Sequence, residues 1–526
     1  MQKQNHNMRT ERKSSIKNSA TRLILIALLV LIQTGWMIVL MSKLNTYSTA
    51  ITLIMTCIAV IIALKVFGTH VNSAQRMPWL IVITAVPFFG ICIYLLFGRS
   101  IVTKGMRRRF NGIEADILKN KLKQDEQIIK ELEQKDPGIA NQCRYISNTA
   151  KYPVYKNTDM EYYNTALESF EAQLWELSKA EKFIFMEYHA IEDAISFERL
   201  KKVLIDKAKN GVEVRIFYDD LGSIFFLNKE FIKRMRDEGI QCRVFNPLKV
   251  IVNMFMNNRD HRKITVIDGK VGFTGGYNLA DEYFNITHPY GYWKDTGVKL
   301  TGDAVKSLTA SFLTMWNAID YTDSQEAYDE YIDATDGTYN AASQECYVQP
   351  YSDNPLGHDR IGEDVYLNIL KNAKHYVYIT TPYLIITDEM ERELRLAVKR
   401  GVDVRIVTPG IPDKKMVYKI TRSYYEPLCS AGVRIYEYTP GFCHAKQWVA
   451  DDEVCVVGTI NMDFRSLYLH FENAVFTYNR ELAGKVKADM LNNFEISNEV
   501  TSDYAVDVIR PLKLGTCMLH MISPLL

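Results

Sequence analysis

The sequence predicts an α/β protein with two similar lobes, preceded by an N-terminal helical transmembrane region. Three observations support this fold class: a strand, helix, glycine, strand pattern that occurs twice, two His-Lys-Asp motifs of identical spacing, and long uncharged stretches before residue 98. A chain of 526 residues is longer than one ordinary domain, and 47% apolar with 24% charged residues is typical of globular proteins. The net charge of +1 does not indicate a nucleic-acid binder.

Three apolar segments, at 23–41, 44–66 and 77–98, follow a basic N-terminal tail at 1–22. The first has no charged residue, and its length is enough for one helix to cross a bilayer. It lacks a small-residue cleavage site and a second apolar run follows it directly. The sequence therefore favours an uncleaved anchor over a signal peptide.

Basic residues flank the apolar region on both sides. Residues 1–22 carry six Lys or Arg against one Glu, and residues 99–109 carry five against none. The positive-inside rule places both flanks in the cytoplasm, which requires an even number of crossings. Either the segment 77–98, which contains Pro87 and Gly90, is re-entrant or interfacial, or the rule fails on one flank. We expect two crossings and a body on the cytoplasmic side of the membrane.

A basic, helical linker is expected at 99–140. Its part at 112–136 is rich in helix formers with intermixed charges, which predicts a solvated helix between membrane and body. The run Arg107–Arg109 would either contact anionic headgroups or serve as a solvated flank.

The body repeats itself. Asn210–Ile216 (NGVEVRI) and Arg400–Ile406 (RGVDVRI) match, and each follows a strand-like and a helix-like stretch; Gly239–Pro247 and Gly432–Pro440 form a further matching pair. Strand, helix, glycine, strand is the βαβ signature of a largely parallel sheet. We expect a first lobe at 141–322, an exposed acidic connection at 323–345, a second lobe at 346–500 and an apolar C-terminal tail at 501–526.

Each lobe carries one H-x-K-x4-D motif. The motif residues are His261, Lys263 and Asp268 in the first lobe, and His444, Lys446 and Asp451 in the second. Residues i and i+2 of a strand share a face, so each His and Lys should project into one pocket. A small-residue turn follows each motif and contains Asn278 or Asn461, whose amide could donate to an anionic oxygen.

These motifs resemble those of the phospholipase D superfamily, whose hallmark is a pair of HKD motifs at the interface of two lobes. Within it, the chain is similar to bacterial cardiolipin synthases over almost its whole length. The similarity includes YLLFGR at the end of the apolar region, the block NNRDHRKITVIDG, the W-x-D at Trp293 and Asp295, the blocks GFCHAK and GTINMDFRSLYLHFE, and the final ISPLL. Thr459 stands where the family commonly has Ser, and Cys443 precedes the second His.

The resemblance implies a phosphodiester exchange between lipids. His261 would attack phosphorus to form a covalent phosphatidyl-histidine, and His444 would act as acid and base. By the family pattern, Asp295 would orient His261 and Glu472 would orient His444. The two motif lysines and Asn278 and Asn461 would neutralise the phosphate oxygens, whereas the two motif aspartates are expected to fix local structure.

The resemblance also implies that phosphatidylglycerol is both donor and acceptor, giving cardiolipin and glycerol. A hydrolytic phospholipase D and a phosphatidyltransferase with another acceptor alcohol remain alternatives, as does a scaffold that binds anionic lipid without turnover. A nuclease is disfavoured by the membrane segment and the near-zero net charge. We expect no metal, because the repeated partner of each His is Lys, and no nucleotide cofactor, because neither a Walker A loop nor G-x-G-x-x-G follows a strand.

The remaining histidines, the cysteines and two apolar segments are not assigned to the site. The remaining body histidines are expected to be structural: His189, His288, His358, His375 and His470. Nine scattered cysteines predict reduced, mostly buried thiols rather than disulfides or a metal site. Met254–Met256 and Lys249 would either contact lipid or belong to a buried loop, and the segment 512–526 would form an interfacial helix or a packing segment. The oligomeric state stays open.

Overall fold

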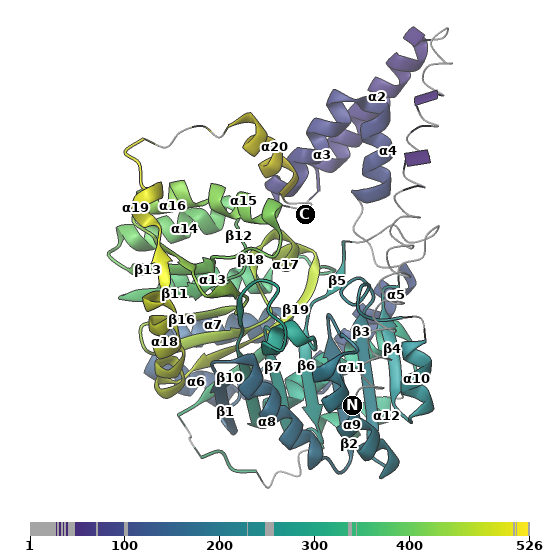
Figure 1. Cartoon of the computed structure of the whole chain (residues 1–526), viewed down its shortest axis with the longest axis vertical. Coiled ribbons are helices and arrows are strands. Elements are labelled where there is room, and N and C mark those ends of the chain that lie inside the picture. The colour runs from purple at the N-terminus through teal and green to yellow at the C-terminus, as the bar shows by residue number, and fades with distance from the viewer. Residues whose placement is uncertain are drawn as a thin grey trace.

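Two α/β lobes lie beside each other, and a group of helices projects from one end of the molecule (Figure 1). The computed structural model describes residues 48–69, 72–98, 104–228, 230–247, 257–323, 325–334, 339–342, 345–508, 511 and 513–523, with isolated positions between 28 and 39. The basic tail at 1–22, most of the apolar segment 23–41, and Lys249 with Met254–Met256 lie outside the described residues.

The first lobe contains a seven-stranded sheet in the order β1, β9, β7, β6, β2, β3, β4. β2, β3 and β4 run parallel, and the other neighbours pair antiparallel. The strands are β1 (Thr158–Tyr163), β2 (Phe183–Tyr188), β3 (Glu213–Asp219), β4 (Gln241–Phe245), β6 (Lys263–Ile267), β7 (Val271–Gly275) and β9 (Gly297–Gly302).

The second lobe repeats this order as β10, β19, β17, β16, β11, β13, β14, and β20 extends the edge. The strands are β10 (Tyr347–Asp353), β11 (Tyr376–Thr380), β13 (Asp403–Pro409), β14 (Arg434–Tyr438), β16 (Gln447–Ala450), β17 (Val454–Gly458), β19 (His470–Tyr478) and β20 (Ser497–Glu499). Each strand of the first sheet thus has a counterpart in the second, which confirms the two similar α/β lobes expected from the repeat.

Helices cover both faces of each sheet. The first sheet is covered by α8 (Ala166–Ser178) and α9 (Ile195–Lys209) on one face and by α11 (Val305–Ile319) on the other. Alternate residues of β2 divide between the faces: Phe185 packs with Phe312 of α11, and Ile184 joins the cluster under α8 and α9. The remaining helices of the first lobe are α10 (Phe231–Asp237) and the 3-10 turn η2 (Asp281–Phe284).

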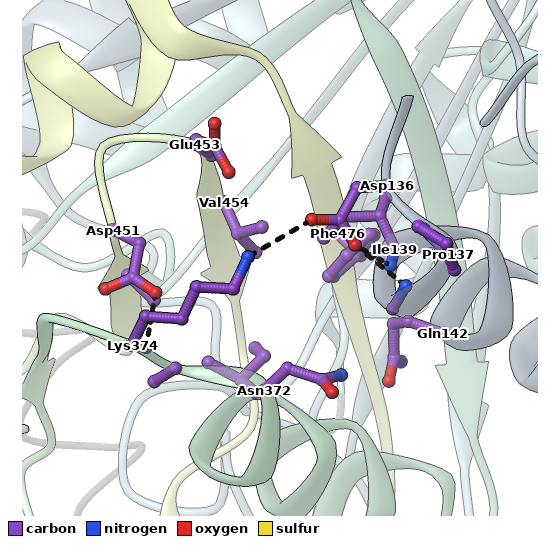
Figure 2. A pocket seen from close by; sticks show the side chains of 14 residues that line it. Asp136, Pro137, Ile139, Gln142, Asn372, Lys374, Asp451, Glu453, Val454 and Phe476 are labelled. Atoms are coloured by element: carbon purple, nitrogen blue, oxygen red, sulfur yellow. Dashed lines mark hydrogen bonds and ion pairs between the residues drawn. The ribbon is translucent and has the colours of Figure 1, made fainter. Parts of the chain in front are cut away.

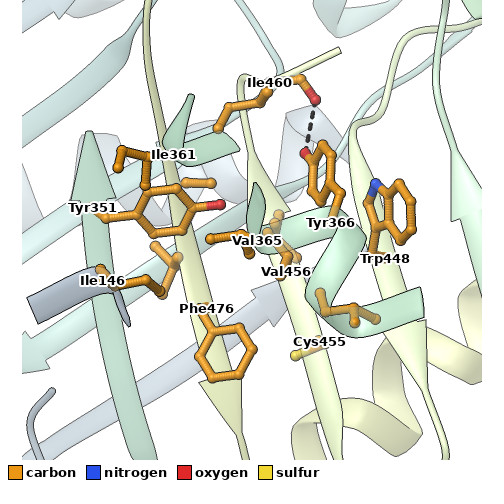
Figure 3. Packing of buried hydrophobic residues seen from close by; sticks show 14 of the residues in the cluster. Ile146, Tyr351, Ile361, Val365, Tyr366, Trp448, Cys455, Val456, Ile460 and Phe476 are labelled. Atoms are coloured by element: carbon orange, nitrogen blue, oxygen red, sulfur yellow. Dashed lines mark hydrogen bonds between the residues drawn. The ribbon is translucent and has the colours of Figure 1, made fainter. Parts of the chain in front are cut away.

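The second lobe carries α13 (Ile361–Asn372), α14 (Asp388–Lys399), α15 (Lys415–Ser423), α16 (Tyr425–Ala431), α17 (Phe464–Tyr468) and α18 (Arg480–Glu495). Tyr366 of α13 stacks on Trp448 of β16, with ring centroids 4.3 Å apart (Figure 3). The Tyr366 hydroxyl donates to the carbonyl of Ile460 at 2.9 Å. This contact fixes the turn that leads to Asn461.

One hydrophobic core runs through both lobes. α11 is buried on nearly every side, as expected for a helix enclosed by other elements, and it contacts β6 of the first sheet and β10 of the second. Full burial of Phe312 alone contributes about 1.5–3 kcal/mol relative to an exposed ring. The two lobes therefore form a single packed body.

The segment expected as a solvated helix is instead part of this core, so that prediction is wrong. It forms α5 (Lys104–Asn120), α6 (Glu126–Lys135) and α7 (Pro137–Thr149). α5 lies along α11 and buries its apolar side, and Phe110 contacts Phe471 at a ring distance of 5.1 Å. Arg109 donates to the carbonyl of Ala318 at 2.9 and 3.0 Å, so its guanidinium binds the end of α11. The charged residues alternate with an apolar stripe that α11 covers.

The acidic connection is exposed in part, as expected, since the side chains of Asp329, Asp333 and Glu345 are at least half exposed, but it is also anchored to the first lobe. It contains α12 (Gln325–Ile332), whose Tyr328 and Ile332 are buried against the first lobe. Asp323 forms a buried ion pair with Arg215 at 2.7 Å. Acidic composition alone predicted exposure, but a paired carboxylate can be buried at the lobe surface.

The projecting helices are α2 (Ser48–Phe67), α3 (Ser73–Ala85) and α4 (Pro87–Phe97). The apolar segment 77–98 is divided at Pro87, and a side chain on Gly90 would meet the Val82 carbonyl at 2.2 Å, so α3 and α4 pack closely. In the parts of the chain given above, no helix is both long enough and apolar enough to cross a membrane.

The C-terminal tail forms α19 (Thr501–Tyr504) and α20 (Leu514–Ile522). α20 contacts both α3 and α15, and the His520 ring stacks on Tyr424 with centroids 4.6 Å apart. All nine cysteines are free, and only Cys57 and Cys517 are exposed. This agrees with the expectation of reduced, mostly buried thiols.

Candidate active site

Two short strand pairs bring the HKD motifs together at the lobe interface. β5 (Arg259–Asp260) precedes His261 and pairs with the start of β19 in the second lobe. β15 (Gly441–Cys443) precedes His444 and pairs with β8 (Tyr292–Lys294) in the first lobe. The His261 amide donates to the Phe471 carbonyl at 2.8 Å, and the His444 amide donates to the Lys294 carbonyl at 2.7 Å. Each histidine is thus held by backbone of the opposite lobe.

Each motif imidazole is paired with a carboxylate from the opposite lobe. His261 Nδ1 lies 2.9 Å from Glu472, and His444 Nδ1 lies 2.6 Å from Asp295. The expected pairing, Asp295 with His261 and Glu472 with His444, is therefore wrong. Both carboxylates do orient an imidazole, but the exchanged strands place each one across the interface.

The two carboxylates have different surroundings. Glu472 also accepts hydrogen bonds from the hydroxyls of Thr459 and Ser466. Asp295 accepts from His444 and from the backbone amide of Thr296 at 3.0 Å. Gly276 occupies the position that corresponds to Thr459, and a Cβ there would lie 2.0 Å from Asp295 Oδ1. Glycine is therefore required in the first lobe, whereas the second lobe places a donor at the same point.

Both motif lysines are almost completely buried beside their histidines. Lys263 Nζ donates to the His261 carbonyl at 2.5 Å, and Lys446 Nζ lies 2.8 Å from His444 Nδ1. Burial lowers the pKa of Lys263 to about 7 and that of Lys446 to about 8, with the neighbouring carboxylates opposing this effect. Both lysines therefore change between their charged and neutral forms near neutral pH.

The surroundings of both motif imidazoles favour their neutral forms. Burial, followed by the charge of Lys263, lowers the pKa of His261 well below its ordinary value. Burial and Lys446 lower the pKa of His444 to about 4, although Asp295 opposes them. An anionic phosphodiester would add negative charge and raise both values, which favours proton uptake when substrate is bound.

The motif aspartates lie at hairpin turns rather than beside the histidines. Asp268 accepts three backbone N–H bonds from residues 181–183, at 2.7–2.9 Å, and Asp451 accepts three from residues 374–376, at 2.7–2.9 Å. Both have a positive φ, 52° and 54°. They connect the motif hairpin to the start of β2 or β11, in agreement with the structural role expected for them.

Asn278 and Asn461 are buried in the turns that follow the motif hairpins. Asn278 donates to the Tyr283 hydroxyl at 2.8 Å and accepts from the Ala190 amide at 3.1 Å. One of its two amide hydrogens is therefore used within the protein. The backbone N–H of Asn461 donates to the Ser466 hydroxyl at 2.8 Å. Phosphate binding by these side chains stays a prediction.

Sequence reasoning missed two residues that contact the site. The rings of His189 and His470, both expected to be structural, lie 5.0 and 5.6 Å from the His261 ring. Burial lowers the pKa of each to about 3, so both are neutral. The only available signal was for His470, which lies two residues before Glu472, as Trp293 lies two residues before Asp295.

His261, His470 and Glu472 place possible metal-ligand atoms within 4.8 Å of one another. However, His470 Nε2 accepts a hydrogen bond from Arg465 Nε at 3.2 Å, so the ring hydrogen of His470 is on Nδ1. Cation binding at Nδ1 would move that hydrogen to Nε2 and break the bond to Arg465. A metal-free reaction remains our prediction.

A separate pocket lies at the far end of the second motif hairpin. Its lining includes Asp451, Lys374 and Asp136, and Lys374 Nζ lies 3.6 Å from Asp136 Oδ2 (Figure 2). None of the catalytic histidines lines it. The pocket is therefore not the site of the chemistry.

Comparisons with known proteins identify first the class and then the family. The model of the phospholipase D-like domain of cardiolipin synthases matches residues 174–316 and 366–493, and a phospholipase D-nuclease N-terminal model matches residues 54–99. A phosphatidylserine synthase from Haemophilus influenzae shares the fold with a TM-score of 0.52 and 14% identity, over 69% of this chain and 92% of that one. The chain is thus a two-lobed phospholipase D-like protein.

Two curated relatives identify the family within this class. A cardiolipin synthase from Clostridium perfringens is 32% identical over 86% of this chain and 95% of its own length. An uncharacterized protein from Streptococcus mutans is 39% identical over 88% of this chain and 99% of its own length. The chain belongs to the cardiolipin synthase family of the phospholipase D superfamily.

The contact between Gly276 and Asp295 gives a direct test of the crossed pairing. Gly276→Ala should displace Asp295 from His444 and lower kcat about 10–100-fold, because an orienting partner of a catalytic group is lost. Phospholipid turnover by the purified variant measures the effect. Gly484→Ala, at a helical position with open space, is the matched control and should retain activity. Equal activity in both variants would contradict the proposed role of Asp295.

Proposed function

We propose that this protein is a cardiolipin synthase that transfers a phosphatidyl group between two phosphatidylglycerol molecules. The observation that carries the proposal is the pair of imidazoles at one interface, each oriented by a carboxylate of the other lobe and each beside a buried lysine. Family membership supports the same activity. Phosphatidylglycerol as both substrates is the specific part of the proposal.

His261 acts as the nucleophile. Glu472 holds its Nδ1, which leaves Nε2 to attack phosphorus, and its lowered pKa keeps the lone pair available. As the P–N bond forms, the P–O bond to the headgroup glycerol breaks. His444 donates a proton to the departing oxygen, and Asp295 stabilises the imidazolium from which that proton comes.

The second half of the reaction reverses these roles. The hydroxyl of a second phosphatidylglycerol gives its proton to His444 and attacks phosphorus, and the P–N bond to His261 breaks. Cardiolipin leaves, and His444 releases to solvent the proton that corresponds to the one taken up when substrate bound, so both imidazoles return to their neutral resting state. Lys263 and Lys446 stabilise the charge of the five-coordinate phosphorus in both halves.

Phosphatidylglycerol vesicles without added metal test this function. We expect cardiolipin and free glycerol in equal amounts, and loss of both in His261→Ala, because no nucleophile remains. Lipid chromatography and a glycerol assay measure the products. Phosphatidic acid with glycerol would favour the hydrolase alternative, and the absence of any product would favour the lipid-binding scaffold.

The lowered pKa values of the lysines predict a pH profile. Each lysine is charged below its pKa and loses that charge as pH rises, so kcat/KM should fall through about pH 7–8. Initial rates in neutral detergent micelles containing phosphatidylglycerol measure the profile. Lys263 has the lower pKa and loses its charge first, so Lys263→Arg, which keeps its charge to higher pH, should move the alkaline limb upward. An alkaline limb that does not move in this variant contradicts the assignment.

We also propose that the protein resides in the bacterial cell membrane, with its body on the cytoplasmic side. Exposed apolar side chains on α2, including Leu53, Ile61 and Leu64, would face lipid. α20, with Leu514 and Met518 exposed, lies beside α3 and would rest on the same surface.

Carbonate extraction of bacterial membranes tests this location. We expect the protein to stay in the pellet, and protease added to inverted vesicles to digest the body, whereas protease added to intact protoplasts should not. Release by carbonate would argue against integral insertion. Digestion in protoplasts would place the body on the outer face.

A further inference from the structure

The two catalytic imidazoles have chemically different neighbours. The His444 ring is enclosed by the aromatic rings of Tyr283, Trp293 and Phe442, at centroid distances of 5.4, 5.3 and 5.8 Å. Tyr283 and Trp293 also contact each other, at 4.5 Å. Within this aromatic enclosure the His444 residue is only 6% exposed.

Trp293 is rigidly placed within the enclosure. Asn285 holds its backbone from both sides: the Trp293 amide donates to Asn285 Oδ1 at 2.7 Å, and Asn285 Nδ2 donates to the Trp293 carbonyl at 2.9 Å. Trp293 packs on Phe442 at 4.8 Å, and the residue is only 5% exposed. Its ring therefore keeps one position relative to His444.

The indole N–H of Trp293 has no acceptor among the described residues. A buried donor without a partner costs about 1–3 kcal/mol, and buried donors normally have an acceptor. The unpaired indole N–H of Trp293 therefore needs an explanation. The corresponding residue of the other lobe is His470, whose Nδ1 lies 3.7 Å from Glu472 Oε1, so the unpaired donor is a feature of Trp293 rather than of His470. Both rings lie two residues before the orienting carboxylate and beside the imidazole of the opposite lobe.

We infer that Trp293 is a specificity-determining residue whose indole N–H donates to the non-reacting hydroxyl of the glycerol headgroup. This inference rests on the proposed function. The headgroup of phosphatidylglycerol carries two hydroxyls on adjacent carbons, and His444 exchanges a proton with only one of them. The other hydroxyl supplies the acceptor that the indole lacks, and the apolar rings pack on the carbon chain.

This arrangement selects a diol over water or a simple alcohol. Water and monohydric alcohols have no second hydroxyl, so they leave the indole N–H unpaired when the reacting oxygen is at His444. A site built to hydrogen-bond a substrate group discriminates strongly against analogues that lack it. The phosphatidyl-histidine is thereby directed to glycerol headgroups.

The product ratio tests the inference. Phosphatidylglycerol vesicles in buffer containing propan-1-ol can give three products: cardiolipin, phosphatidic acid and phosphatidylpropanol. Trp293→Phe keeps an aromatic ring and removes the N–H together with part of the indole volume, a loss of volume that Trp316→Phe shares. We expect the ratio of cardiolipin to the other two products to fall about tenfold relative to wild type. A merely structural role would lower all three products together.

Matched variants separate the indole donor from general effects. Trp316→Phe removes another buried indole N–H without a described acceptor, in the core helix α11, and should leave the product ratio unchanged. His470→Phe removes the donor on the His261 side and should lower all products without changing their ratio. Asn285→Gly keeps the left-handed backbone of this position (φ 55°) but releases Trp293, and should shift the ratio in the same direction as Trp293→Phe.

The outcomes distinguish the two levels of the proposal. Wild-type protein that forms no cardiolipin overturns the proposed function and this inference with it. Cardiolipin formation with unchanged ratios in both Trp293→Phe and Asn285→Gly overturns the inference alone. An equal shift in Trp316→Phe also overturns it, because the effect would then not belong to the active site.

Discussion

The catalytic centre depends on two short strand pairs that cross the lobe interface. β5 lies against β19 and β15 lies against β8, and each pair ends at a catalytic histidine. Parallel pairing sets the register, so His261 meets Glu472 and His444 meets Asp295. A single lobe would contain a histidine and a lysine but not the carboxylate that orients the imidazole. The active site therefore forms only when both lobes have folded and docked.

The single core explains why this docking is permanent. α11 lies between the sheets, and α5 closes over it, so apolar residues of both lobes belong to one packed cluster. Burial of this much apolar surface keeps the lobes from separating, which would also break both strand pairs. α5 is thus part of the same core as the two lobes.

Burial of charged groups is the main electrostatic feature of the site. Two lysines and two imidazoles lie at the interface with Asp295 and Glu472, and all are at least nine-tenths buried by residue. Charges removed from water are costly unless they are paired, and here the cost lowers the pKa of Lys263 and Lys446. A phosphodiester supplies the negative charge that restores their protonated forms. Binding and charge stabilisation therefore depend on the same groups.

Local pattern was sufficient to predict much of this protein. Strand alternation and the repeated βαβ segments gave the two lobes, and the spacing of the HKD motifs placed each His and Lys on one face. The turns at Asp268 and Asp451 and the nearby Asn278 and Asn461 also follow from neighbouring residues. Composition was less reliable: the charged stretch at 112–136 conceals an apolar stripe that α11 covers, and the acidic connection is held by the pair of Asp323 with Arg215.

What the sequence by itself determined is therefore the chemistry of the site. The imidazoles and ammonium groups follow from the short spacing of each motif within one strand, whereas the carboxylates Asp295 and Glu472 were implied by the resemblance to the phospholipase D superfamily. Only the tertiary structure decided how they combine. The residues of the two imidazole–carboxylate pairs are 149 and 211 positions apart, and exchanged strands join each pair across the interface. The enclosure of His444 by Trp293 and the approach of His470 to His261 arise in the same way. Periodicity describes the faces of one element, whereas pairing between lobes depends on the packing of the whole core.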